Sequence, residues 1–466
     1  MHPDTLKEKR RVVAASAIGT TIEWYDFFIY STSAALVFSS QFFSALDPAT
    51  ALLASMATLG VTFLVRPFGS AITGHYGDRI GRKKMLILTL GVMGAATVAV
   101  GLLPTYAQIG IWAPILLVLM RCLQGFSAGG EWAGAALMAV EHAPPEQRGL
   151  YGSSSQIGTP IGLILANGIF LLMVSTTTEA QFLSWGWRIP FLLSIVLIFL
   201  GFYIRNKVQE SPVFVEMKAA RREERAPLGQ LLREHKRAVT LGAATFLANN
   251  MVGYIFLSFL LSYATNTLKI ARPTMLAIVI GGSFSWLAAI LFSGWIADRI
   301  GARRIFIIGF GAMLVWCIPF MMLVDTRSVL AISVATVLLT ITLGLSYGAQ
   351  SALFAGMFPT RVRYSGASLA YAFGAILGGG FAPFIATYLT QRTQSGTSVG
   401  IYMFVMVAIS LVATIMIRRS DMVGLPHGPA SQHADVPVDE PAARPVATRA
   451  AVCLRARSAC GRPPST

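Results

Sequence analysis

The stretch GHYGDRIGRKK at residues 74–84 returns 220 positions later as GWIADRIGARR at residues 294–304. In each copy a long apolar run stops at a small residue, an Asp-Arg pair follows, and a Gly and two adjacent cations precede the next apolar run. A very short basic loop between two apolar runs is typical of consecutive membrane helices. The repeat therefore predicts a chain of two duplicated halves, each built from membrane-spanning helices.

The composition indicates a membrane protein. Hydrophobic residues make up 55% of the 466 residues and charged residues only 12%, about half of the usual share in soluble domains. The net charge of +16 is spread between apolar runs rather than gathered in a basic domain, so we expect no nucleic-acid partner. The four cysteines have no C-x-x-C or histidine spacing, so we expect no metal site.

Apolar runs long enough to cross a bilayer, about 20 residues each, form two groups of six. The first group predicts spans at 12–38, 50–74, 85–104, 111–140, 151–175 and 187–205. The second predicts spans at 237–265, 273–297, 304–324, 328–357, 364–390 and 399–418. The predicted fold is an all-α membrane protein with twelve transmembrane helices in two pseudo-symmetric six-helix bundles.

The bundles account for residues 1–205 and 237–418, joined by a charged linker at 206–236. The tail at 419–466, rich in Pro, Ala and Ser, is predicted to be disordered. The loops on one side, including the linker, together with the N-terminus and the end of the last span, carry 25 Lys and Arg residues, and the opposite loops carry five. This asymmetry predicts cytoplasmic termini in a multi-pass membrane protein. We further expect a bacterial inner membrane as its location, and a monomer.

Several stretches carry a family resemblance. The two basic loops resemble the loops between helices 2 and 3 and between helices 8 and 9 of the major facilitator superfamily. Five further stretches resemble its metabolite:proton symporters, which carry shikimate, citrate, 2-oxoglutarate, proline or betaine, and the shikimate-like carriers most of all. They are IEWYDFFIY (22–30), RPFG (66–69), QGFSAGGEW (124–132), SWGWRIPF (184–191) and PTRVRYSG (359–366). The resemblance implies a carrier that needs no cofactor and is driven by a proton gradient.

Ionisable side chains deep in a bilayer are expensive unless paired or wetted, so each is a functional candidate. Glu23 and Asp26 lie near the middle of the first span, on one face with Tyr30, and Arg121 lies near the middle of the fourth. We hypothesise that Asp26 or Glu23 carries the proton and that Arg121 biases it. This assumes contact between the two spans. Arg121 either holds a substrate carboxylate or only tunes the acid.

The spacing R-x3-G-x3-G-x-E at residues 121–131 returns as T-x3-G-x3-G-x-Q at residues 340–350. The glycines recur, as expected where neighbouring helices approach closely, whereas the charges occur only in the first half. We therefore place proton coupling in the first half and uncharged substrate contacts in the second. With Tyr30 and Arg121, the predicted contacts are Asn249, Asn250, Tyr254, Tyr347 and Gln350. The alternative for Asn249 and Asn250 is a bond between helices.

Gating is assigned to the two basic loops and to one buried pair. An Asp that faces the N-terminus of another helix is stabilised there by the helix dipole and can latch one conformation. The second copy has Ala302 where the first has Arg82, so we expect the second latch to be the weaker. Arg66 and Glu131 are predicted to pair and close the cytoplasmic side. The gating residues are Gly74, Asp78, Arg79, Gly81, Arg82, Asp298, Arg299, Arg66 and Glu131.

The sequence thus predicts a proton-coupled secondary active transporter that works by alternating access, and the family resemblance implies that it imports a small polar metabolite, an organic acid. Its partners would be that solute, the proton and the lipid bilayer. One alternative is a proton-antiport exporter of a toxic compound, and a second is a non-transporting membrane sensor. We do not expect an enzyme, because the sequence shows no Ser-His pair or metal-ligand spacing that could form a catalytic site. The substrate itself stays open among shikimate, di- or tricarboxylates, hydroxybenzoates and zwitterions.

Overall fold

The structure, a computed structural model, describes residues 3–80, 82–128, 136–137, 139–140, 143–207, 234–359, 362–418 and 421–422. Within these ranges, side chains are not described at 3–16, 70–71, 73–80, 82–84, 86, 204–207 and 364. Residues 1–426 form one compact unit, to which all of the following refers. Most of the predicted linker and nearly all of the predicted tail lie outside the described residues.

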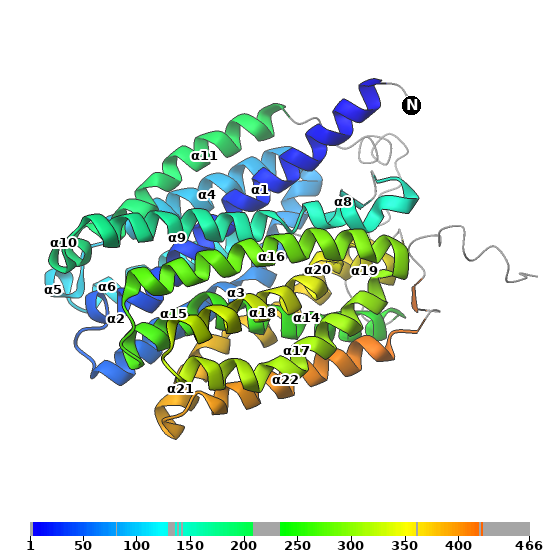
Figure 1. The fold of residues 1–466 in the computed structure, drawn as a ribbon. Coiled ribbons are helices and arrows are strands. Elements are labelled where there is room, and N and C mark those ends of the chain that lie inside the picture. The colour runs from blue at the N-terminus through cyan, green and yellow to red at the C-terminus, as the bar shows by residue number, and fades with distance from the viewer. Residues whose placement is uncertain are drawn as a thin grey trace, which may run out of the picture. The chain divides into compact units, whose positions relative to one another are not determined.

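The first half contains six helical spans (Figure 1). They are α1 (Pro3–Leu36), α3 (Pro48–Ile80), α4 (Arg82–Leu102), α6 (Trp112–Ser127), the pair α8 (Arg148–Ser154) and α9 (Gly158–Thr176), and α11 (Ile189–Lys207). Short helices between the spans are α2 (Phe38–Gln41), α5 (Tyr106–Ile109), η1 (Pro145–Gln147), α10 (Glu179–Ser184) and η2 (Gly186–Arg188).

The second half repeats this order. Its spans are α14 (Lys236–Tyr254) continued by η3 (Ile255–Phe259), α15 (Leu260–Ser262) and η4 (Tyr263–Thr267), then α16 (Arg272–Ile300), α17 (Ala302–Asp325), α18 (Val329–Gly348) with α19 (Gln350–Met357), α20 (Arg363–Ala375) with η5 (Ile376–Gly380) and α21 (Ala382–Thr393), and α22 (Thr397–Met416). Twelve helical spans in two sets of six confirm the predicted fold class.

Apolar length explains why these segments are helices, because a bilayer leaves a backbone no partners but its own. Among the described residues, nine helices are long and apolar enough to cross a membrane, and shorter apolar helices occupy 87–102 and 112–127. Several spans that we predicted as continuous are interrupted, among them the seventh by its π-helical turns and the tenth at Ala349. The fifth breaks between Ser154 and Gly158, and the eleventh passes through η5, where three consecutive glycines weaken a regular helix.

The same helix pairs pack in both halves, so the duplication in sequence is also a duplication in structure. In the first half α1 packs on α9, α3 on α6, and α4 on both α6 and α11. In the second half the matching pairs are α14 with α20, α16 with α18, and α17 with both α18 and α22. Each half is therefore held by helices in equivalent positions of the repeat.

The two halves meet along three lines. α16 packs on α8 and α9, α3 packs on η5 and α21, and α1 packs on η3 and α15. Figure 1 shows α9 and α16 running side by side. We name the two ends of the bundle by an acidic residue at each: the Asp298 end, where α16 finishes and α8 begins, and the Asp325 end, where α17 finishes.

The repeated glycines let helices approach closely, as predicted. A Cβ on Gly125 of α6 would collide with the backbone of Thr62 on α3. In the second half, a Cβ on Gly348 of α18 would collide with the carbonyl of Ile290 on α16. Gly129, the other glycine of the first copy, lies outside the described residues.

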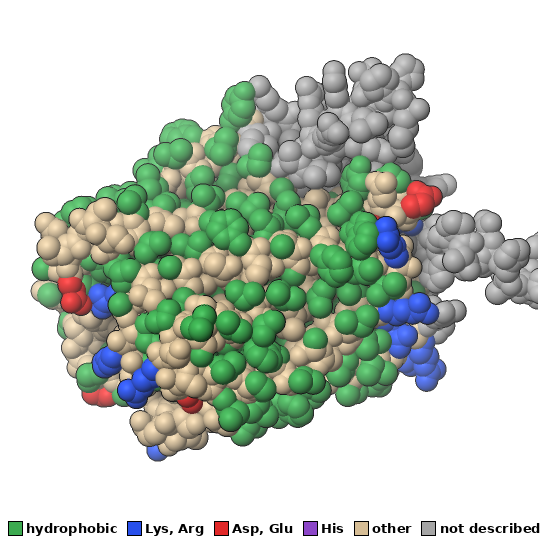
Figure 2. Space-filling model, viewed as in Figure 1, with side chains coloured by type: hydrophobic (Ala, Val, Ile, Leu, Met, Phe, Trp, Pro, Cys, Tyr) green, Lys and Arg blue, Asp and Glu red, His purple; other side chains and the backbone are tan. Residues whose placement is uncertain are grey.

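The outer surface matches a bilayer setting. Figure 2 shows hydrophobic side chains spread along the flank of the bundle, with Lys and Arg gathered near its ends. Large apolar side chains such as Val315 and Leu330 are 75% exposed. Such exposure would be unfavourable in water and is ordinary against lipid tails.

Candidate functional site

The two acids of α1 are buried and face different neighbours. Asp26 is 3% exposed and accepts a hydrogen bond from the Ser194 hydroxyl of α11 at 2.9 Å. The hydroxyl of Thr97 on α4 lies beside the same carboxyl. Asp26 therefore points into its own half, between α4 and α11.

Glu23 is 5% exposed and points towards the other half. Its charge acts on three tyrosines there, Tyr254 of α14, Tyr347 of α18 and Tyr371 of α20. The prediction that Glu23 and Asp26 share one face was therefore too coarse. Residues three apart on a helix differ in direction by about 60°, which separates the interface between the halves from the interior of one half.

Arg121 lies under the ring of Tyr30, with its Cζ atom 3.7 Å from the ring centre, and is 2% exposed. The Tyr30 hydroxyl is tied to Thr58 of α3 at 2.8 Å, which holds the ring in place. Stacking of a guanidinium on an aromatic face is favourable where water is excluded. The guanidinium is thus oriented by packing within the first half.

Arg121 and Asp26 are connected through two uncharged side chains. Arg121 Nη1 donates to Gln124 Oε1 at 2.8 Å, and Gln124 Nε2 donates to Thr97 Oγ1 at 2.8 Å. Thr97 in turn adjoins Asp26. The contact that we assumed from sequence is therefore indirect: among the described residues, Asp26 and Arg121 form no ion pair, because Gln124 and Thr97 lie between them.

Arg66 of α3 lies close to the boundary between the halves. Its Cζ atom is 4.6 Å from the centre of the Phe27 ring and 5.0 Å from that of Phe63. The Tyr371 hydroxyl of the second half lies beside its guanidinium. The predicted partner Glu131 lies outside the described residues, so the gate formed by that pair stays a prediction.

The second half contributes buried polar atoms that have no hydrogen-bond partner among the described residues. Among them are the Tyr254 hydroxyl, the Asn250 side-chain nitrogen and both polar atoms of Gln350. All three residues are at most 5% exposed. A buried polar group without a partner costs about 1–3 kcal/mol, so this arrangement favours a site that a polar ligand or water fills.

Asn249 and Tyr347, two other predicted contacts, have neighbours in place. Asn249 Oδ1 accepts from the Ser346 hydroxyl, which joins α14 to α18 inside the second half. The Tyr347 ring packs edge-on against Trp286, with the ring centres 5.3 Å apart. For the oxygen of Asn249, the alternative of a bond between helices is the one that the structure has.

We call the buried polar residues described above the central cluster. It comprises Glu23, Asp26, Tyr30, Arg66, Thr97, Arg121, Gln124, Ser194, Asn250, Tyr254, Tyr347, Gln350 and Tyr371. Its charged members all come from the first half, and its members from the second half are uncharged. The assignment of proton coupling to the first half and of solute contacts to the second stays a prediction.

At the Asp298 end, one latch has the predicted geometry. Asp298 accepts hydrogen bonds from the backbone N–H groups of Gly149 and Leu150, at the start of α8. Arg299 does not join it but stacks on Trp295, with Cζ 3.8 Å from the ring. In the first copy, Gly81 and the side chains of Asp78, Arg79 and Arg82 lie outside the described residues, and Gly74 is described only as part of α3. The gating role of both copies stays a prediction.

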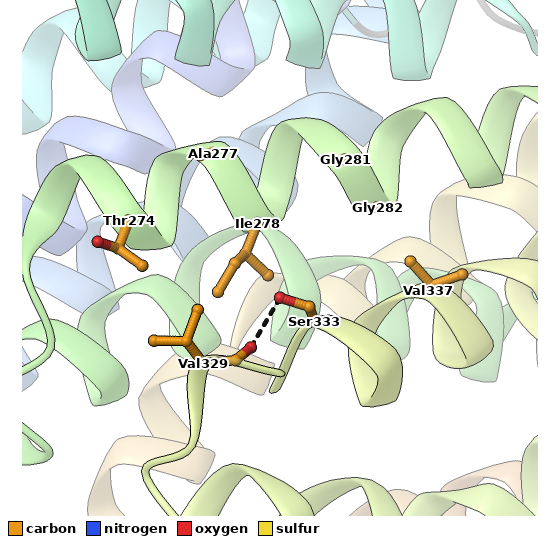
Figure 3. Close-up of a pocket in the computed structure, with 8 residues that line it drawn as sticks. All are labelled: Thr274, Ala277, Ile278, Gly281, Gly282, Val329, Ser333 and Val337. Atoms are coloured by element: carbon orange, nitrogen blue, oxygen red, sulfur yellow. Dashed lines mark hydrogen bonds between the residues drawn. The ribbon is translucent and has the colours of Figure 1, made fainter. Parts of the chain in front are cut away.

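A pocket of about 490 Å³ lies between α16 and α18 (Figure 3), and none of its lining residues belongs to the central cluster. It is lined by Thr274, Ala277, Ile278, Gly281, Gly282, Val329, Ser333 and Val337. The hydroxyl of Ser333 bonds to the Val329 carbonyl within its own helix. The lining carries no charge, so this pocket lacks the groups that hold a charged solute.

Sequence reasoning missed Gln124, Thr97, Ser194 and Tyr371. The first three are uncharged polar residues in apolar spans, where threonine and serine are common and carry no marked penalty. Gln124 and Thr97 are distinguished only by their position between Asp26 and Arg121, and Ser194 only by its hydrogen bond to Asp26. Tyr371 was hidden for a similar reason, because an aromatic residue in a membrane helix usually packs in the core.

Residues 16–383 match the Major Facilitator Superfamily. The chain is 41% identical over 420 residues to the inner membrane metabolite transport protein YhjE of Escherichia coli, covering 89% of this chain and 95% of that protein. It is also 41% identical to the shikimate transporter of Escherichia coli, covering 89% and 96%. Identity to the proline/betaine transporter of Salmonella typhimurium is 32%, covering 88% and 84%.

The fold is similar to that of solved transporters. A crystal structure of a D-xylose-proton symporter superposes with a TM-score of 0.70, covering 89% of this chain and 98% of that chain, at 16% identity. At that identity the likeness concerns the fold alone. Together with the relatives in sequence, these matches show that the chain is a multi-pass membrane transporter and belongs to the Major Facilitator Superfamily, in the branch of the metabolite and shikimate transporters.

Proposed function

We propose that this transporter imports a small organic acid together with a proton. In this proposal Asp26 carries the proton, Arg121 holds the carboxylate of the solute, and the uncharged polar residues of the second half bind the rest of it. The two halves rock about the central cluster and open it to one side of the membrane at a time. The solute and the proton are the only partners that this mechanism requires.

The observation that carries the proposal is a buried carboxylate and a buried guanidinium in one half, Asp26 and Arg121, each at most 3% exposed. A charged group inside a bilayer protein is retained where it serves a charge-moving function. A carboxylate that is alternately protonated and ionised is a proton carrier by type. A guanidinium with N–H groups that are not already hydrogen-bonded binds carboxylates well, because its planar arrangement of donors matches the geometry of the carboxylate.

The ligand class is argued from the donors. Arg121 Nε, Asn250 Nδ2, the Tyr254 hydroxyl and Gln350 Nε2 are buried donors with no hydrogen-bond partner among the described residues. Gln350 Oε1 is a buried acceptor without a partner among the described residues, but the donors outnumber it, which favours an anion with further oxygen atoms. The relative named as a shikimate transporter makes shikimate the first compound to test.

The binding part of the proposal is tested by thermal stabilisation of purified protein against shikimate, citrate, a hydroxybenzoate, proline and glycine betaine. We expect a carboxylate with hydroxyl groups to raise the unfolding temperature and Arg121→Ala to abolish that rise. Stabilisation that persists in Arg121→Ala would remove Arg121 from the binding site. If betaine alone stabilises the protein, the substrate is a zwitterion and not an organic acid.

The coupling part is tested in proteoliposomes with an imposed pH gradient. We expect uptake of labelled shikimate when the outside is acidic, and loss of that uptake in Asp26→Asn. Glu23→Gln is made in parallel, because Glu23 faces the second half and is the rival proton carrier. Uptake that runs against the proton gradient would instead support the exporter. If Asp26→Asn keeps gradient-driven uptake and Glu23→Gln loses it, Glu23 is the proton carrier. If both variants keep it, the proposed coupling is wrong.

The orientation is proposed from charge. Loops assigned to one side carry 25 Lys and Arg residues against five on the other, and positive loops stay in the cytoplasm. This supports cytoplasmic termini, with the Asp298 end facing the cytoplasm. Fusions to a reporter that is active only in the cytoplasm would test this orientation. The fusion after Met416 should be active and the fusion at Gln394 inactive, and the reverse result would invert the orientation.

A further inference from the structure

We propose that Gln124 is the positioning residue through which a proton on Asp26 and an anion on Arg121 affect each other. The inference rests on the proposed function and adds a residue to which no part of that function was assigned. It starts from one geometric fact. Gln124 is 2% exposed, and each end of its amide is used: Oε1 accepts from Arg121 and Nε2 donates to Thr97.

The direction of these hydrogen bonds is set by chemistry. A guanidinium can only donate, so the Gln124 oxygen must face Arg121 and the nitrogen must face Thr97. Thr97 Oγ1 accepts that N–H, and its own hydrogen has two acceptors in reach: the Met93 carbonyl at 2.9 Å and the adjoining Asp26 carboxyl. The Thr97 hydroxyl is therefore a two-position switch next to the proton carrier.

Ionised Asp26 draws the Thr97 hydrogen. The donors then run in one direction, from Arg121 through Gln124 and Thr97 to the carboxylate, and the positive and negative charges balance. When Asp26 takes a proton from the aqueous side, its charge is lost and the Thr97 hydrogen turns to Met93. The chain loses its anionic end, and the charge of Arg121 is then uncompensated in a medium of low dielectric.

Arg121 then attracts the carboxylate of a solute. The bound anion accepts the hydrogen bond that Arg121 Nη1 otherwise donates to Gln124. When Asp26 loses its proton to the other side of the membrane, the chain of hydrogen bonds from Arg121 to Asp26 forms again and the anion is released. Because the two affinities are thermodynamically linked, a bound anion also favours the proton on Asp26. Gln124 is thus the piece that makes proton and solute travel together.

Other charges around Asp26 act from different directions. Glu23 on the same helix interacts electrostatically with Asp26, and Asp26 interacts electrostatically with the adjacent Tyr25. Ser194 of α11 donates to Asp26 Oδ1. From α3, Arg66 stacks on Phe27. None of these contacts includes Gln124, so a substitution there leaves them in place.

The second half shows that the fold does not require the chain. The repeat offset of 219 places Leu343 at the position of Gln124, and the offset of 220 places Cys317 at that of Thr97. Both are fully buried in helices that pack as α6 and α4 do. Leucine is therefore a substitution that this scaffold already accommodates, which makes Gln124→Leu a fair test.

The test separates accumulation from exchange in proteoliposomes. Accumulation of labelled shikimate is driven by a pH gradient, whereas exchange of labelled for unlabelled shikimate needs no net proton movement. In Gln124→Leu and Thr97→Val we expect accumulation to fall roughly fivefold or more, with exchange retained. Thr97→Ser keeps the hydroxyl and should behave as the parent. Thr62→Val is the matched control, since that buried hydroxyl has no partner among the described residues.

A second readout needs no ligand. The infrared carbonyl band of protonated Asp26, identified by its absence in Asp26→Asn, should appear at a higher pH in Gln124→Leu and in Thr97→Val but not in Thr62→Val, because the hydrogen-bond chain stabilises the ionised carboxylate. A band that appears at an unchanged pH in both variants overturns the inference, even if shikimate is not carried. A merely structural role would lower accumulation and exchange together, which also overturns it.

Failure of the inference and failure of the proposed function look different. If Asp26→Asn abolishes accumulation while Gln124→Leu and Thr97→Val keep it, Gln124 has no part in coupling and the proton-coupled function stands. If Asp26→Asn itself keeps accumulation, the proposed proton carrier is wrong, whatever Gln124 does.

Discussion

Asp298 of α16 accepts a hydrogen bond from the backbone N–H of Gly149, so a carboxylate of the second half caps the first turn of a helix in the first half. The neighbouring N–H of Leu150 donates to the other carboxylate oxygen at 2.9 Å. An anion at a helix N-terminus gains about 0.3–1 kcal/mol from the dipole, and up to about 2 in partly buried places. These bonds join the two halves at the Asp298 end, whereas other contacts, among them the ion pair of Arg272 with Glu179, join them at the Asp325 end.

Weakening this latch should favour the conformation in which the Asp298 end is open. Asp298→Asn keeps the shape and one acceptor oxygen but loses the charge. We expect maleimide to label Ser351→Cys several-fold faster in this background, because Ser351 is buried where the halves touch near that end. Labelling at an unchanged rate would show that Asp298 does not hold the end closed.

The matching residue of the first repeat gives a second prediction. Asp78→Asn should lower transport while expression stays unchanged, since the repeat places Asp78 near the end of α3, as Asp298 lies near the end of α16. The first copy retains Arg82 where the second has Ala302, so we expect the larger loss at Asp78. The measurement is initial uptake normalised to protein in the membrane. Normal uptake in Asp78→Asn would withdraw the gating assignment.

Arg121→Lys should weaken carboxylate binding although it preserves the charge. An ammonium cannot stack on Tyr30 as a planar guanidinium does, nor match the fork of a carboxylate. Losing one hydrogen bond to a charged group costs roughly 1.5–3 kcal/mol, about ten- to hundredfold in affinity. Titration of shikimate followed by thermal stabilisation measures this change.

The matched control is Arg299→Lys. Arg299 makes the same kind of ring contact, 3.8 Å over Trp295, but at the exposed Asp298 end. Its substitution should leave shikimate affinity unchanged. An equal loss in both variants would indicate a general effect of arginine replacement and not a site at Arg121.

Tyr263→Phe should destabilise the Asp325 end. The Tyr263 hydroxyl donates to Asp325 Oδ1 at 2.9 Å, and the N–H of Gly396 donates to Asp325 Oδ2 at 2.9 Å. The carboxylate thus ties the end of α14 and its continuation to the start of α22. Removing the hydroxyl should lower stability by roughly 1.5–3 kcal/mol, seen as a lower unfolding temperature in detergent. Tyr388→Phe, an exposed tyrosine, should have no such effect.

Gly348→Ala should loosen α18 from α16. A methyl group there meets the carbonyl oxygen of Ile290 and the Cβ of Ser293, so the helices must separate or the backbone must shift. Overpacking of this kind costs typically about 1–3 kcal/mol. Gly281→Ala, on the open side of α16 with no atom within 4 Å, is the control and should be neutral or slightly stabilising. Equal stability of the two variants would contradict the packing argument.

The repeat at residues 74–84 and 294–304 was sufficient to predict twelve helices in two sets. The physical reason is local: in a bilayer each backbone group must be satisfied within its own helix, so apolar length alone specifies a span. Interruptions of the fifth and eleventh spans escaped prediction, because they depend on how α8 and η5 pack against the other half.

Single charged residues could also be found from sequence, whereas their connections could not. Asp26 and Arg121 are conspicuous because a buried charge is expensive wherever it lies. Their link through Gln124 and Thr97 requires α4 to lie beside both α6 and α11, and α11 beside α1. No spacing along one helix encodes which neighbour it meets.

The sequence by itself determined the number and order of the helices, the duplication and the identity of the buried charges, because each follows from the free energy of placing one residue or one segment in lipid. Only the tertiary structure decided that Asp26 turns into its own half while Glu23 turns towards the other, and that an amide joins Asp26 to Arg121. Those outcomes depend on the rotation and partners of each helix, which arise from packing among all twelve.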